Sequence, residues 1–252
     1  MMSGDRGSYP LYAWLASYAQ KDAVIQRILL GLNWTMAETD SGIGLAFSPV
    51  DIPRTLDWPG TLAGKRVREV LPWLRGGQPA EAAIALAVLN SAVDAEWARE
   101  AKTLNDLEAP HLAVFHYFRE LVRGSKIAVV GHYPGLEKFW HDIAYVCIER
   151  RPRQGDLAES EAMTVLPRSD WVFITASSLA NGSLPLLLQL SAEAQVVLMG
   201  PSLPWVKGWQ DWGVNYLAGV RVRDGAALWQ TVAEGGGTRI FHTGVDYRLL
   251  RL

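Results

Sequence analysis

The sequence predicts an α/β protein in which a small α+β unit precedes a doubly wound, mostly parallel sheet. Four short and continuous apolar runs recur in the second half, and such runs are typical of strands buried on both faces of a parallel sheet. Helical segments separate these runs, which gives the βαβ rhythm of a Rossmann-like domain. Hydrophobic residues make up 49% of the 252 residues and charged residues 20%, so the chain can build a large core.

The first part of the chain predicts the α+β unit. Apolar residues at helical spacing precede a hairpin signal, in which two apolar segments flank Asp40, Ser41 and Gly42. Proline and glycine residues then mark an irregular crossing, and Pro79 stands where a later helix should begin. The predicted elements are a helix over 9–32 with a break near Lys21 and Asp22, strands over 33–39 and 43–47, a short helix over 67–74 and a helix over 81–91.

Strands and helices alternate in the second part. The predicted strands are the apolar runs at 127–130, 145–148, 171–174 and 196–199, with a fifth apolar segment over 216–222. The predicted helices cover 112–122, 136–143, 160–166, 184–191, 206–212 and 226–234. The change of pattern near residues 95–110 divides the chain into two predicted domains, 1–105 and 106–252.

Composition excludes several classes of function. Lys and Arg number 24 against 26 Asp and Glu, so the formal net charge of −2 gives no electrostatic basis for binding nucleic acid. The single cysteine, Cys147, excludes a disulfide framework and a zinc site built from cysteines, and it favours a reducing cytoplasm. Residues 1–8 carry no convincing secretion signal, and polar residues interrupt the longest uncharged run, 171–192. A soluble cytoplasmic protein without a membrane span is expected.

Four loops follow the four apolar runs, at 131–135, 149–152, 177–183 and 200–204. Open parallel sheets bind ligands beyond the carboxyl ends of their strands, so these loops should converge on one edge and form a site. His132 is the preferred candidate for acid–base catalysis or ligation, because imidazole titrates near neutral pH. Ser177 and Asn181 could bind a ligand through hydrogen bonds, or they could cap the following helix.

The loop at 131–135 occupies the position of a dinucleotide-binding turn. Glu149 follows Gly131 by 18 residues, near the ~20 expected for an acid that binds ribose. The sequence GHYPG lacks the G-x-G-x-x-G spacing, and Pro134 removes an amide that would donate to a phosphate. The alternative function is therefore a nucleotide- or S-adenosylmethionine-dependent enzyme with a degenerate phosphate loop.

The spacing of ligating residues predicts no resident metal site. The five histidines are scattered along the chain, which has a single thiol. Structural zinc sites need about four protein ligands and catalytic sites about three. Residues distant in sequence could still assemble such a set.

A set of motifs spans nearly the whole chain, about residues 10–235. The second part contains VVGHYP, LPRSDWVFITASSLANGSL, VVLMGPSLP and YLAG. These motifs together resemble the DUF364 family, for which a role in making or handling a heavy-metal chelator has been suggested without an established reaction. In the first part, WTMAETDSGIGLAFSP, LAGKRVREVL and LAVLNSA are similar to the DUF4213-type N-terminal domain that accompanies the family.

The resemblance implies an α+β domain similar to the enolase N-terminal domain, joined to a Rossmann-like domain, with a ligand site in the cleft between them. The residues that match the family pattern are Gly131, His132, Pro134, Asn181, Gly182, Gly200, Pro201 and Ser202 in the loops, and Glu38, Gly42, Gly44 and Asn90 in the N-terminal domain. His132 and Glu38 are the candidate catalytic residues, and the other polar groups, with Glu149 and Ser177, would orient the ligand.

The predicted function is that of a cytoplasmic small-molecule-binding protein or enzyme. Its expected ligand is a metal chelator or the precursor of one, held in the interdomain cleft. Nucleic acid and membranes are not expected partners. The cofactor, the reaction and association into a homo-oligomer are left open.

Overall fold

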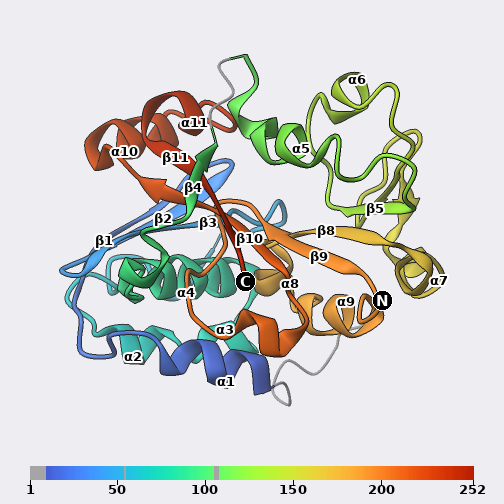
Figure 1. The fold of residues 1–252 in the computed structure, drawn as a ribbon. Coiled ribbons are helices and arrows are strands. Elements are labelled where there is room, and N and C mark those ends of the chain that lie inside the picture. Colours follow the sequence, from blue (N-terminus) through green and yellow to red (C-terminus); the bar gives the residue numbers. More distant parts are fainter. Residues whose placement is uncertain (1–9, 54, 105–107) are drawn as a thin grey trace.

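The computed structural model describes residues 10–53, 55–104 and 108–252, which form two β-sheets (Figure 1). The smaller sheet is antiparallel and has the order β1 (Ile25–Leu30), β2 (Trp34–Thr39) and β3 (Gly42–Phe47). The larger, mixed sheet has the order β4 (Lys102–Leu104), β11 (Val245–Arg251), β10 (Tyr216–Val222), β9 (Gln195–Met199), β8 (Trp171–Thr175), β5 (Ile127–Val130), β6 (Val146–Glu149) and β7 (Leu157–Ala158). Together the two sheets confirm the predicted α/β class.

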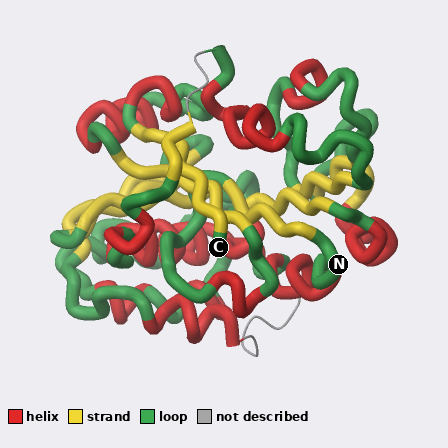
Figure 2. Tube along the Cα trace, in the orientation of Figure 1, coloured by secondary structure: helices red, strands yellow, loops and turns green. Residues whose placement is uncertain are grey.

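Helices lie on both sides of the strand layer (Figure 2). The α-helices of the described residues are α1 (Pro10–Ser17), α2 (Val67–Val70), α3 (Trp73–Gly76), α4 (Pro79–Ala92), α5 (Ala113–Phe118), α6 (Leu136–Phe139), α7 (Ala162–Val165), α8 (Ser178–Asn181), α9 (Leu184–Leu190), α10 (Gly225–Ala233) and α11 (Ile240–Thr243). Short 3₁₀ turns occur at Glu96–Ala98, Pro110–Leu112, Glu159–Glu161, Leu166–Arg168 and Trp209–Trp212.

The buried helix α4 joins the two parts of the molecule. Pro79 occupies its first turn, and the Glu81 carboxylate accepts a hydrogen bond from the Gln78 amide (2.7 Å), which caps the helix. β2 and β3 pack against α4, and α8 from the second part also contacts it. The hairpin comes closest at Gly44, where an added Cβ would lie 2.1 Å from the Ala87 carbonyl oxygen. The absence of a side chain at Gly44 therefore sets the distance between hairpin and helix.

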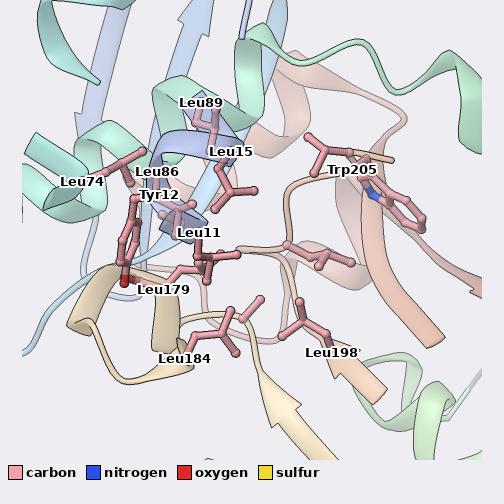
Figure 3. Close-up of a cluster of buried hydrophobic side chains, with 14 of the residues drawn as sticks. Leu11, Tyr12, Leu15, Leu74, Leu86, Leu89, Leu179, Leu184, Leu198 and Trp205 are labelled. Carbon is pink, nitrogen blue, oxygen red and sulfur yellow. The ribbon is translucent and has the colours of Figure 1, made fainter. Parts of the chain in front are cut away.

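Both parts of the chain share one apolar core. Leu11 and Leu15 of α1 pack in a single buried cluster with α4, α8 and β9 (Figure 3). Across this junction, the hydroxyl of the buried Tyr12 donates to the Leu179 carbonyl oxygen at 2.9 Å. The other face of the larger sheet carries a second buried cluster that includes Phe173. Apolar side chains therefore cover both faces of the larger sheet.

The structure confirms the predicted hairpin and the buried strands. β2 pairs antiparallel with β3, with Ala37 opposite Gly44. β5, β6, β8 and β9 lie in the four apolar runs and pair in parallel, and β10 adds the fifth apolar segment. All four residues of β5 are buried, which explains the absence of polar alternation along it.

The predicted helix over 9–32 is wrong in its second half. α1 ends at Ser17, and the later residues form β1, in which Ile28 lies opposite Ala37 of β2. Pairing with β2 supplies the backbone hydrogen bonds of this segment, so tertiary context overrides a weak helical pattern. The helix predicted over 206–212 is reduced to a 3₁₀ turn, and the one predicted over 112–122 ends at Phe118.

The predicted domain boundary between residues 105 and 106 lies outside the described residues, as does the stretch 1–8. β4, just before that boundary, pairs antiparallel with β11 at the edge of the larger sheet. No helix among the described residues has the length and apolar character needed to cross a membrane. The uncharged run at 171–192 is divided among β8, α8 and α9.

Candidate functional site

The loop after β9 meets the hairpin and α4 at the junction of the two sheets. The Ser202 hydroxyl accepts a hydrogen bond from the Phe47 amide at 2.8 Å. The Asn90 side-chain amide donates to the carbonyl oxygens of Leu45 (2.8 Å) and Ser202 (3.1 Å). Ser202 and Asn90, both predicted from sequence, are thus brought together, and they hold the three segments in place.

A cavity of about 190 Å³ opens beside this junction. Its lining includes Gly42, Gly44, Asn90 and Pro201, four of the residues predicted from sequence. The charged residues of the lining are Glu96, Arg99, Arg221 and Arg248. The cavity therefore carries an excess of positive charge.

The arginines of the cavity differ in their partners. Arg99 pairs with Glu96, and Arg248 donates to the carbonyl oxygens of Ala101 (2.8 Å) and Arg99 (2.9 Å). Arg221 is exposed and forms no ion pair with any residue that the structure describes. Its guanidinium is thus available to an anionic group in the cavity.

The side-chain oxygen of Asn90 is a hydrogen-bond acceptor that receives no hydrogen bond from any described residue. Its Oδ1 atom is buried and has no hydrogen-bond partner among the described residues. A buried polar atom left without a partner costs about 1–3 kcal/mol, so such an atom at a cavity calls for an explanation. Asn90 lines the cavity, and a donor group that reached Oδ1 from there would satisfy it.

A second group of predicted residues lies beyond β5 and β6. The Glu149 carboxylate accepts hydrogen bonds from the backbone amides of His132 (2.9 Å), Arg150 (2.8 Å) and Arg151 (3.4 Å). Both carboxylate oxygens are therefore used in tying the two loops together. This engagement disfavours the hypothesis that Glu149 binds the ribose of a nucleotide.

The side chain of His132 lies among three polar groups. Its Nε2 atom is 2.9 Å from the Arg153 guanidinium, and its Nδ1 atom is 3.5 Å from a carboxylate oxygen of Asp156. His132, Cys147 and Asp156 each offer one ligand atom, and these atoms lie within 4.8 Å of one another. Residue spacing did not reveal this group, because its members come from separate segments.

Two members of this group have shifted pKa values. Burial, and then the neighbouring Asp156, raise the pKa of the Cys147 thiol to about 12. Burial acts to raise the pKa of Asp156, but hydrogen bonds from the Arg153 amide and the Cys147 thiol, together with the His132 ring, outweigh it and hold that pKa below its usual value. In the metal-free protein, Cys147 is therefore a protonated thiol beside an ionised carboxylate.

We expect Cys147 to react slowly with iodoacetamide at pH 8, because only the thiolate is nucleophilic. The rate in the folded protein should fall below the rate in urea-unfolded protein by about a hundredfold or more. Since Cys147 is the only cysteine, mass spectrometry of the intact chain measures it directly. Similar rates in the two states would contradict the protonated, buried thiol.

The loop after β8 has a largely local structure. The Asn181 side-chain oxygen accepts from the Ser183 amide (3.0 Å) and hydroxyl (2.7 Å), and Gly182 ends α8 with a φ of 82°. The Ser177 hydroxyl is 3.0 Å from that of Thr175. Asn181 and Gly182 therefore shape the turn before α9. The N-cap of α9 is Ser183, and no side chain caps its first turn, so neither Ser177 nor Asn181 caps this helix.

Gly131 and Gly200 each have a positive φ directly after a strand, at 103° and 112°. Both approach Thr175 of β8, and a Cβ on Gly131 would lie 2.9 Å from its methyl group. The Pro134 carbonyl oxygen is 3.0 Å from Nε2 of His111. These residues set the course of the loops at the carboxyl edge of the sheet.

Glu38 lies apart from both groups. Its carboxylate pairs with Arg27 at 2.6 Å, and the Arg27 guanidinium stacks 3.8 Å from the centre of the Trp229 ring. This places Glu38 on the face of the smaller sheet that packs against α10. The structure does not bring the two predicted catalytic residues, Glu38 and His132, into contact.

Sheet order also separates His132 from the cavity. The end of β10 lines the cavity, whereas His132 follows β5, and β9 and β8 lie between these strands. Neighbouring strands are about 4.8 Å apart, so roughly 14 Å separates β10 from β5. The predicted residues thus fall into a junction group around Asn90 and an edge group around His132.

Models of two protein families match the chain. The DUF364 model, described as "Putative heavy-metal chelation", matches residues 113–251. The chain belongs to the DUF364 family. The DUF4213 model, with the same description, matches residues 12–93 of this DUF364 protein. The resemblance drawn from the motifs is confirmed.

Two solved structures from the DUF364 family are similar to this chain, and both are of proteins with unknown function. The protein from Desulfitobacterium hafniense DCB-2 has 26% sequence identity and a TM-score of 0.85, over 98% of this chain and 100% of that one. The protein from Pyrococcus horikoshii has 20% identity and a TM-score of 0.73, over 98% and 99% of the two chains. No match was found among curated proteins.

Proposed function

We propose that this DUF364 protein binds a small polycarboxylate metabolite of the chelator class, or the precursor of one, in the cavity at the junction of its two sheets. One observation carries the proposal: the residues that line this cavity include three arginines and Asn90, whose Oδ1 atom has no hydrogen-bond partner among the described residues. Carboxylates of the ligand bind the arginines, and a hydroxyl or amine donates to Asn90. The reduced, buried Cys147 is consistent with a cytoplasmic protein.

The size of the cavity favours a small ligand. Its volume of about 190 Å³ is below the ~300–1,000 Å³ of pockets that hold drug-sized molecules. A dinucleotide or S-adenosylmethionine needs more room than this. Together with the engaged carboxylate of Glu149, the volume favours a compact metabolite over the nucleotide-dependent alternative.

The charge of the lining favours carboxylate groups. The lining contains three arginines and one glutamate, and Arg221 forms no ion pair with a described residue that would compete with a ligand. Metal chelators of low molecular mass combine carboxylates with hydroxyl or amine groups, because hard and borderline cations prefer oxygen and nitrogen ligands. The two kinds of group match the arginines and the Asn90 acceptor respectively.

Titration calorimetry with citrate, a compact hydroxy-polycarboxylate, tests the proposal. Arg221→Gln is expected to weaken citrate binding about tenfold, because a charge-assisted hydrogen bond at an exposed arginine contributes about 1.5 kcal/mol. Its melting temperature should not change, since the Arg221 side chain is exposed and forms no ion pair with a described residue.

Arg168→Gln is the matched control. Arg168 is also exposed and forms no ion pair with a described residue, but it does not line the cavity. Equal losses of affinity in the two variants, or no heat of binding in the wild type, would contradict the proposal. Mass spectrometry of small molecules released from the denatured protein would then identify the ligand class independently.

A further inference from the structure

Three neighbouring strands bring three metal-ligating side chains to one point, away from the junction cavity. His132 follows β5, Cys147 lies within β6, and Asp156 directly precedes β7. β6 pairs in parallel with both other strands, with Cys147 opposite Val129 of β5. The sheet itself therefore sets the relative positions of the three side chains.

The fold holds each of these residues by further contacts. The Asp156 carboxylate accepts from the Arg153 amide at 3.0 Å, and the His132 backbone is tied to Glu149. The Cys147 sulfur lies 3.7 Å from the Gly131 carbonyl oxygen. The side chains of His132 and Asp156 are 23% and 9% exposed, so the group is partly shielded yet open through His132. These contacts hold the three side chains near one another before any cation binds.

The donor set selects a class of cation. An imidazole nitrogen, a thiolate and a carboxylate oxygen are the ligands that Zn²⁺ and similar thiophilic divalent ions accept. The His132 and Asp156 atoms are 3.5 Å apart, close to the ~3.4 Å between two ligands of one tetrahedral zinc ion. All three ligand atoms lie within 4.8 Å of one another, so side-chain movements of roughly 1 Å would bring them to the distances of a tetrahedral site.

We propose that His132, Cys147 and Asp156 form a binding site for a thiophilic divalent cation such as Zn²⁺. Three protein ligands leave one tetrahedral position for water or for a donor atom of a chelator. On coordination, the thiol proton leaves to solvent and the sulfur binds as thiolate. The site is independent of the junction cavity, so either proposal can fail without the other.

The positive charge of Arg153 opposes the binding of a cation at this site. Arginine can only donate, so the His132 Nε2 atom accepts from it and the neutral ring carries its proton on Nδ1, beside Asp156. A cation that binds Nδ1 moves that proton to Nε2, where it points at the Arg153 guanidinium. Arg153 is exposed and can swing into solvent. Removing its charge should therefore strengthen metal binding.

Titration of the tag-free protein with Co²⁺ tests the site by absorption spectroscopy. A thiolate ligand gives Co²⁺ a near-ultraviolet charge-transfer band, and Cys147 is the only thiol that can produce it. The wild type should show this band at a ratio of one Co²⁺ per chain, and Cys147→Ser should lose it. Asp156→Asn should weaken Co²⁺ binding about tenfold or more, whereas Arg153→Gln should strengthen it by a similar factor.

His141→Gln is the control, because His141 is exposed and its ring forms one hydrogen bond among the described residues, with the Lys138 carbonyl oxygen. Circular dichroism verifies that each variant is folded. A folded wild type without the band overturns the proposal even if Cys147→Ser does not fold. A band that persists in Cys147→Ser, or an affinity that Asp156→Asn leaves unchanged, overturns it as well.

Discussion

Gly44→Ala should lower the free energy of unfolding by about 3 kcal/mol or more. A Cβ at this position would lie 2.1 Å from the Ala87 carbonyl oxygen and 2.4 Å from the Ser91 amide nitrogen. Both contacts are with the backbone of α4, which cannot turn aside as a flexible side chain would. Because α4 is buried between the hairpin and the second part of the chain, moving it would disturb the shared core. Urea denaturation measures the loss.

Gly76→Ala is the matched control for this substitution. Nothing lies within 4 Å of a Cβ built on Gly76, and its φ is not positive. The variant should be as stable as the wild type or gain up to about 1 kcal/mol, because alanine restricts the unfolded chain. A Gly44→Ala protein within about 1 kcal/mol of the wild type would show that the hairpin can separate from α4 at little cost.

Phe173→Ala should destabilise the protein by about 3–5 kcal/mol, the usual range for a buried aromatic residue cut back to alanine. Phe173 is fully buried in β8, and its ring centre lies 5.4 Å from those of Phe115 and Phe118 and 5.7 Å from that of Trp140. The cavity left behind cannot close without moving several rings that pack on each other. Thermal and urea unfolding both measure the effect.

Phe47→Ala provides the comparison, because Phe47 is 40% exposed and its ring packs edge-on against that of Trp34. It should cost about 1 kcal/mol, the range of one aromatic pair. Equal losses of unfolding free energy for Phe47→Ala and Phe173→Ala would contradict this account. They would mean that burying Phe173 in the aromatic cluster stabilises the protein no more than one half-exposed aromatic pair does.

The buried strands could be predicted because burial on both faces leaves a direct mark on composition. β5, with four buried residues, has no polar position at all. β1 could not be separated from a helix, because its apolar residues fit both periods and only the pairing with β2 decides between them. No strand is predicted over 245–251, although the residues there alternate between buried and half-buried positions as those of an antiparallel strand should.

The candidate sites were predictable to different degrees. Asn90 and Ser202 were found through the motifs, and the structure brings them into hydrogen-bond contact. Asp156 could not be linked to His132 or Cys147, because the loop that carries it has no periodicity to reveal its path. The sequence does not show which face of the smaller sheet carries the Glu38 side chain. The ion pair between Glu38 and Arg27, seen only in the structure, places it on the face that packs against α10.

Hydrogen–deuterium exchange with citrate present is the most direct test of whether the junction cavity binds the ligand. Citrate should slow exchange together in residues 41–45, 90–99 and 201–205, because these three segments line one cavity. The Arg221→Gln variant should need about ten times more citrate for the same protection. Protection confined to 131–135 and 146–156, or unchanged exchange at saturating citrate, would contradict the junction site.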